Sequence, residues 1–127
     1  MRHEVSWDDA HGCVRLTLRG PFLLDDARVM LDAIDRALVG RPRRYLLIDH
    51  TESPGALPPE TRRYIQSSGQ QMERIAFFGM SNLTRVAARV IVAVIGQSGH
   101  TGIFKSEAEA LAWLGKPGAT DESIGRG

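Results

Sequence analysis

The chain has 127 residues and a formal net charge of +1, and 43% of its residues are hydrophobic and 24% charged, as in one ordinary globular domain. This near balance of charge gives no general attraction to nucleic acid or to anionic membranes, so we expect no nucleic-acid partner. One cysteine excludes an intrachain disulfide, and the lack of a signal region or of an apolar run of about 20 residues predicts a cytoplasmic protein without a membrane span.

Two short strands open the chain and are predicted to form an antiparallel hairpin. Residues 4–8 and 14–18 alternate apolar and polar side chains, with the period of a half-buried strand, and a turn-forming cluster links them. Gly20 and Pro21 end the second strand. Leu24–Leu38 follows, with apolar residues at three- and four-residue spacing that predict an amphipathic helix.

Two continuous apolar runs predict strands that are covered on both faces. The first run is residues 45–49, which ends at Asp49, and the second is residues 75–79. Between them a helix should begin at Pro59, because proline suits the first turn of a helix. The apolar stripe of this helix is thin and extends to Met72, so we expect it to be the least buried helix.

The last third of the chain predicts a helix, a short strand and a final helix. Residues 83–95 carry a broad apolar face, and Arg85 and Arg89 mark the side expected to face water. Residues 102–104 can form a short strand. Ser106 and Glu109 have the spacing of a capping box, which opens a helix through Leu114.

The order of these elements predicts a single α/β domain over residues 1–115, followed by a flexible C-terminal tail at residues 116–127. The sheet should be mixed and mostly parallel, with the N-terminal antiparallel β-hairpin at one side and about four helices.

Polar residues follow the two apolar runs, at the sheet edge where open α/β sheets bind ligands. An aspartate there serves as a charged anchor, as a phosphoacceptor, or as a cap that bonds its own loop, and the sequence leaves these three roles of Asp49 open. We predict a binding surface here, formed by Asp49, His50, Thr51, Ser53, Met80, Ser81 and Asn82. Ser81 or Asn82 can also cap the helix that follows.

No catalytic motif is present in the sequence. Cys13 is the only thiol, and a cysteine in a strand is more often a small buried hydrophobe than a nucleophile. His3, His50 and His100 have no companions at metal-ligand spacing. We therefore expect no cofactor, no metal and no enzymatic activity. A hydrolase or phosphotransfer enzyme that uses Asp49 and His50 is the alternative.

Four stretches, RRYLLID, PPETRR, RIAFFG and FKSEAEALAWL, together with the order of the elements, resemble the SpoIIAA-like branch of the STAS superfamily, also named STAS/SEC14-like. The resemblance covers about residues 3–115 and implies a small cytosolic α/β module, mostly non-enzymatic. Anti-sigma-factor antagonists of this fold bind a partner kinase, which phosphorylates a Ser or Thr in an Asp-Ser-Ser-Gly-like stretch. Here residues 50–55 replace that stretch, and the nearest phosphoacceptors are Ser53 and then Thr51.

The resemblance and the strand-end residues together give two expectations about function. The first is a non-catalytic regulatory or binding module, similar to an anti-sigma-factor antagonist, whose partner is a protein of the kinase or anti-sigma-factor type. Its surface would comprise residues 49–57, the start of the helix at Pro59 and residues 80–83. The alternative is a carrier of a small apolar, lipid-like molecule, because the apolar face of residues 83–95 can line a pocket. A homodimer through the exposed hairpin edge is a further expectation.

Overall fold

The structure, a computed structural model, describes residues 3–53, 55–68, 72–94 and 100–116. Apart from Lys116, the expected tail at residues 116–127 lies outside the described residues. In chain order the elements are β1 (Glu4–Asp8), β2 (Cys13–Arg19), α1 (Leu24–Leu38), β3 (Tyr45–Glu52), α2 (Pro59–Ser68), β4 (Arg74–Phe78), α3 (Asn82–Val94), β5 (Thr101–Phe104) and α4 (Glu107–Leu114).

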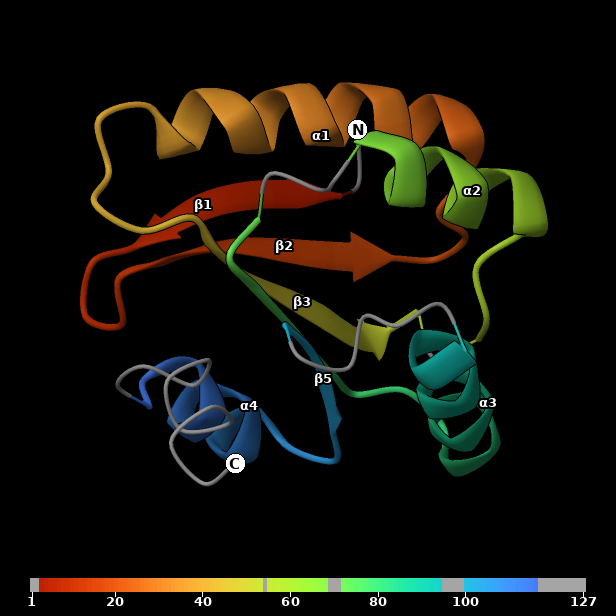
Figure 1. Ribbon diagram of the computed structural model, residues 1–127. Helices are drawn as coiled ribbons and strands as arrows, with labels where there is room; N and C mark the ends of the chain where they lie inside the picture. The colour runs from red at the N-terminus through yellow and green to blue at the C-terminus, as the bar shows by residue number, and fades with distance from the viewer. Residues whose placement is uncertain (1–2, 54, 69–71, 95–99, 117–127) are drawn as a thin grey trace.

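The five strands form one sheet in the order β1-β2-β3-β4-β5. β1 pairs antiparallel with β2, and each later strand pairs parallel with the strand before it. Figure 1 shows this sheet twisting from the N-terminal hairpin to β5. The predicted α/β domain, with a mostly parallel sheet and an antiparallel hairpin at one side, is confirmed.

Helices pack on both faces of the sheet. On one face, α1 and α2 cover alternate strand residues such as Val14, Leu16 and Ile48. On the other face, α4 covers Cys13, Leu47 and their neighbours. This division follows from the pleat, because successive side chains of a strand point to opposite faces. The parallel strands therefore have to be apolar on both faces, as the runs in β3 and β4 are.

α4 is fixed at both of its ends. At the start, the Ser106 hydroxyl accepts a hydrogen bond from Glu109 N, while Glu109 Oε1 accepts one from Lys105 N rather than from Ser106 N. At the end, buried Arg74 donates from one guanidinium nitrogen to Trp113 O at 3.0 Å and to Leu114 O at 2.9 Å. A cation beside the last carbonyls of a helix is favoured by the helix dipole.

Four sequence-based expectations about the elements are wrong. β3 does not end at Asp49 but continues to Glu52, and α2 ends at Ser68, so buried Met72 lies beyond the helix. α2 is not the least buried helix either, because its Thr61 is completely buried, whereas residues 82–91 of α3 are all half-buried or exposed. The fourth error concerns α3, whose apolar residues point to solvent: Leu83 is 83% exposed, and Val86 and Val90 are each 58% exposed.

Candidate functional site

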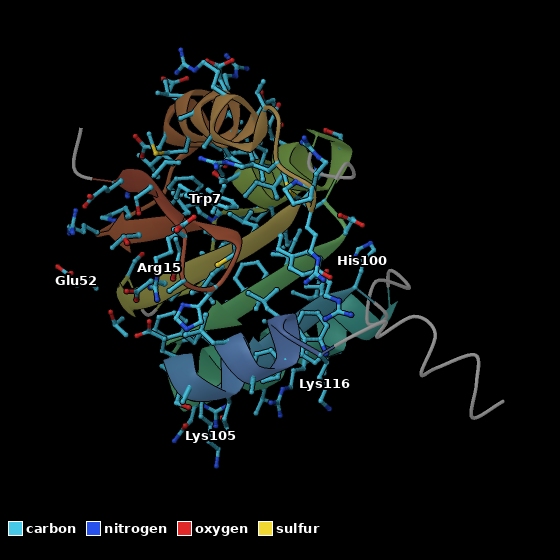
Figure 2. All side chains as sticks on the ribbon, turned by 90° about the vertical axis from the view of Figure 1, so that its left-hand side faces the viewer. Trp7, Arg15, Glu52, His100, Lys105 and Lys116 are labelled. Carbon is cyan, nitrogen blue, oxygen red and sulfur yellow. The ribbon has the colours of Figure 1, made fainter. Side chains whose placement is uncertain are left out.

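A hollow of about 340 Å³ opens where β2 and β3 end, at the carboxyl side of the parallel sheet. Its walls come from the turn after β2 and from the loop between β3 and α2, and most of its side chains are apolar. We call it the β2–β3 hollow, lined by Gly20, Pro21, Phe22, Glu52, Ser53, Gly55, Ala56, Leu57 and Pro58. Figure 2 shows Glu52 at one side of the molecule and His100 and Lys116 at the other.

The floor of the β2–β3 hollow is held by pairing between the ends of the two strands. Gly20 N donates to Glu52 O at 2.9 Å, and Gly20 has a φ of 75°, which places it in the left-handed region that glycine tolerates. Arg19 Nε lies 3.5 Å from Glu52 Oε2. Phe22 and Leu57 join the hydrophobic core below, so the hollow rests on packed side chains.

His50 fixes the start of the loop that forms one wall. Ser53 N donates to His50 O at 2.9 Å, and the His50 Nδ1–H can donate to Ser53 O, which is also 2.9 Å away. The imidazole is 1% exposed and lies 5.6 Å from the Phe77 ring, measured between ring centroids. This burial lowers the pKa of His50 below its ordinary value, although the bond to Ser53 O opposes the change. The ring is therefore neutral at physiological pH.

Asp49 bonds to its own strand end. Its Oδ1 accepts from Thr51 N at 2.8 Å and from the Thr51 hydroxyl at 2.6 Å, which is the capping role that the sequence left open for this carboxylate. In a strand, consecutive residues point to opposite faces, so the Asp49 carboxylate and the His50 imidazole do not converge. An acid–base pair made of these two side chains is geometrically disfavoured.

The predicted residues after β4 lie on the other side of the β3 end. β4 is the neighbour of β3, and a Cβ built on Gly79 would lie 2.6 Å from Thr51 N, so the two chain segments touch. Half-buried Met80 follows. The Ser81 hydroxyl accepts from Thr84 N at 3.2 Å and donates to the Thr84 hydroxyl at 2.9 Å, so Ser81 caps α3. Asn82 is the exposed first residue of the helix.

The structure therefore does not gather the seven predicted site residues around one cavity. Of these, only Ser53 lines the β2–β3 hollow, while Thr51 lies beside Gly79 and the turn that leads to α3. The sequence interpretation treated Gly20 and Pro21 only as a strand stop and gave Phe22 no role. Their position was nevertheless implied, because a parallel β2–β3 pair brings the residues after both strands to the same edge of the sheet.

Two other kinds of site remain to be considered, a reactive thiol at Cys13 and a metal-binding cluster. Burial, followed by the nearby Asp8 carboxylate, raises the pKa of the Cys13 thiol to about 11, so at neutral pH it carries its proton and is a poor nucleophile. Within residues 3–53, 55–68, 72–94 and 100–116, no group of three His, Cys, Asp or Glu side chains is placed to hold a metal ion. None of the helices in these ranges is long and apolar enough to cross a membrane.

Comparisons with known proteins agree with this fold. A family model described as SpoIIAA-like matches residues 13–115. A crystal structure from Shewanella loihica PV-4, described as an uncharacterized protein with a SpoIIAA-like fold, matches with a TM-score of 0.64 and 23% sequence identity. The match covers 88% of this chain and 91% of the other. No curated protein matches the chain. Because the family model spans most of the described domain, this chain belongs to the SpoIIAA-like family.

Proposed function

We propose that this SpoIIAA-like protein is a non-catalytic binding module, and that it binds a partner protein at the β2–β3 hollow. The observation that carries this proposal is the hollow itself, a concave, largely apolar site at the carboxyl ends of two parallel strands. Open α/β sheets bind their ligands in this position. Its size suits one or two apolar anchor side chains of a partner, of the kind that contribute most of the energy of many interfaces.

The chemistry around the hollow supports binding rather than catalysis. Asp49 is occupied by Thr51, the His50 ring is buried and neutral, and the Cys13 thiol is protonated. No nucleophile and base among these side chains face a common space. The polar groups at the hollow are Glu52 and Ser53, which can fix the orientation of a partner at the rim.

The same geometry bears on regulation by phosphorylation, which stays a prediction. The Thr51 hydroxyl donates to the Asp49 carboxylate, so a phosphoryl group there would meet a like charge. Ser53 lies at the wall of the hollow, so a phosphoryl group on Ser53 would place charge where an apolar anchor binds. We therefore rank Ser53 ahead of Thr51 as the phosphoacceptor. Phosphopeptide mass spectrometry of the protein from its native cells distinguishes the two.

The test of the proposed function compares two charge insertions at exposed alanines. Ala56→Arg places a guanidinium at the hollow, and Ala10→Arg places one in the hairpin turn, far from the carboxyl ends of the parallel strands. Each tagged protein is crosslinked in a native extract, and its recovered partners are quantified by mass spectrometry. We expect Ala56→Arg to lower the recovery of the specific partner by about tenfold, the effect of losing one anchor contact. Equal recovery with both variants would contradict the proposal.

A small apolar ligand is the second candidate, because the hollow volume of about 340 Å³ lies at the lower end of the range for small-molecule pockets, which begins at roughly 300 Å³. Native mass spectrometry of gently purified protein should then show an added mass. Ala56→Trp, which fills the hollow with an indole, should remove that mass, and Ala10→Trp should keep it. Protein that carries no added mass under these conditions counts against the carrier role.

A further inference from the structure

α3 has an apolar stripe that no other described element covers. Leu83, Val86 and Val90 are spaced by three and then four residues, so they align along one face of the helix. Their exposed fractions are 83%, 58% and 58%, whereas the large apolar residues of α1 that face the sheet are buried. Figure 1 shows α3 beside β5, apart from α1 and α2. We call these three side chains the α3 stripe.

The side of α3 that faces the rest of the domain carries the half-buried residues Thr84, Ala88 and Ile91. Arg89 donates from Nε and from a terminal guanidinium nitrogen to Ile103 O, at 3.2 and 2.7 Å. The bonds satisfy a carbonyl of the edge strand β5 and tie the helix to it, while Arg89 as a residue stays exposed and borders the stripe, three residues after Val86. The half-buried Arg85 precedes Arg89 by one helical turn. The α3 stripe is therefore left facing outward.

The stretch of sequence that contains α3 carries basic but no acidic residues. No Asp or Glu occurs between Glu73 and Glu107, whereas Arg85 and Arg89 both lie within α3. Arg89 bonds a neutral carbonyl, and among the described residues Arg85 forms no ion pair. Some arginines elsewhere face carboxylates, as Arg15 faces Asp8 and Arg36 faces Asp32, and others lie over aromatic rings, as Arg41 lies over Trp7. The stripe thus combines exposed aliphatic side chains with cations that have no carboxylate beside them.

We propose that the α3 stripe docks an amphipathic helix of a partner protein, one whose apolar seam is flanked by Asp or Glu residues. The spacing of Leu83, Val86 and Val90 matches the seam through which two helices pack. Acidic residues on the incoming helix would find Arg85 and Arg89 at the rim, where complementary charge selects the partner and its orientation. This surface shares no residue with the β2–β3 hollow.

Two other occupants fit these observations less well. A second copy of the chain would bring its own α3, with Arg85 and Arg89 and no acidic residue, against the same cations. A membrane-surface helix usually presents aromatic as well as aliphatic residues to the lipid, and the α3 stripe contains no aromatic side chain. An acidic helix supplies both the apolar contact and the opposite charge.

The experiment screens a displayed library of randomised helical peptides against the full chain and measures the Kd of the enriched peptides by fluorescence anisotropy. We expect enriched peptides with an apolar seam flanked by Asp or Glu. Val86→Asp should weaken their binding by about tenfold or more, and added salt or Arg85→Glu should also weaken it. The control is Val29→Asp, on α1, where Val29 is 49% exposed and the Kd should not change. Urea denaturation checks that both Asp variants unfold at the wild-type midpoint.

Several results would overturn the proposal. Failure to enrich any helical peptide, enrichment of basic peptides, or an unchanged Kd with folded Val86→Asp would each exclude an acidic helix as the occupant. Sedimentation that shows a homodimer, dissociated by Val86→Asp, would assign the stripe to a second copy of the chain. Flotation of the wild type, but not of Val86→Asp, with vesicles of phosphatidylcholine and phosphatidylglycerol would assign it to a membrane surface. The Ala56→Arg experiment is independent of all these outcomes.

Discussion

Gly79 shows how closely the ends of β3 and β4 approach each other. Its φ is 89°, and a Cβ there would lie 2.6 Å from both Thr51 N and Thr51 Cγ2. Gly79→Ala should therefore lower the free energy of unfolding by about 3 kcal/mol, through left-handed backbone strain and a clash with backbone that cannot move freely. Urea denaturation measures the loss.

Gly12→Ala is the matched control for Gly79→Ala. Gly12 also has a positive φ, 64°, but a Cβ added at Gly12 would meet no heavy atom within 4 Å. The backbone strain alone should cost about 1 kcal/mol. An equal loss in the free energy of unfolding for the two variants would contradict the close approach of Gly79 to Thr51.

His50 should make stability depend on pH in a defined window. Burial lowers its pKa in the folded state below the ordinary value of 6.5, which the unfolded chain retains. As pH falls below about 6.5, the unfolded chain therefore gains a proton that the folded chain resists, and the free energy of unfolding decreases. The decrease levels off once the pH passes below the folded pKa. Urea denaturation between pH 7.5 and pH 5 should show a smaller decrease for His50→Gln than for the wild type, and equal slopes would refute this assignment.

The side chains of the candidate site could be predicted from the sequence only in part. The apolar run up to Ile48 correctly indicated β3, but Asp49, His50 and Thr51 are polar, so the pattern gave no reason to extend the strand to Glu52. His50 is polar yet buried because its Nδ1 faces Ser53 O and its ring contacts Phe77, and neither contact is visible in local sequence. The faces of the sheet to which Asp49 and His50 point follow from the strand continuing through both residues, so the sequence alone did not give these directions.

Among the elements, α4 depends on a side chain from β4. Arg74 is 6% exposed and donates to the carbonyls of Trp113 and Leu114 at the end of the helix. Arg74→Met keeps most of the apolar bulk but leaves both carbonyls without this donor. We expect a loss of about 2 kcal/mol in the free energy of unfolding and faster hydrogen exchange in α4.

Arg43→Met is the control for Arg74→Met. Arg43 is exposed, and its guanidinium carbon lies 5.4 Å from the centre of the Tyr45 ring. Its replacement should change the free energy of unfolding by less than about 0.5 kcal/mol. A similarly small effect for Arg74→Met would show that α4 does not require the buried arginine.

The elements were more predictable than the way they pack. α1 was predicted with its observed bounds, because its apolar period, its acidic first turn and the glycine beyond its end all agree. α3 was predicted as a helix, and Arg89 is exposed as expected, but Leu83, Val86 and Val90 of its apolar face are exposed too. Periodicity shows that a helix has an apolar face, yet only tertiary contacts decide whether that face is covered, and here Thr84, Ala88 and Ile91 form the half-buried side instead.

Across the domain as a whole, charged side chains join the hairpin to α4. Arg15 on β2 bonds Asp8 on β1 at 2.9 Å and also bonds Glu107 at the start of α4. Burial alone would raise the pKa of Asp8, but the hydrogen bonds from Arg15 and His11 outweigh it and lower the pKa. β1 still forms an outer edge of the sheet, so a homodimer through that edge stays a prediction.

The order of the elements was sufficient to predict the fold, because alternating strands and helices with short links leave few arrangements of a parallel sheet. It was not sufficient to locate the β2–β3 hollow. The hollow combines residues 20–22 with residues 52–58, and only the pairing of β2 with β3 brings these two segments together. The proposed function depends on whether a partner binds there.

Photo-crosslinking from single positions can decide whether a partner binds at the β2–β3 hollow. A photoreactive amino acid replaces Ala56 at the hollow in one variant and Ala10 in the hairpin turn in another, and both are irradiated in native cells. We predict that one specific partner is crosslinked from position 56 and not from position 10, and that this crosslink disappears when Gly55→Trp crowds the hollow. Crosslinks of equal yield and identity from positions 56 and 10, or none from position 56, would contradict binding at the β2–β3 hollow.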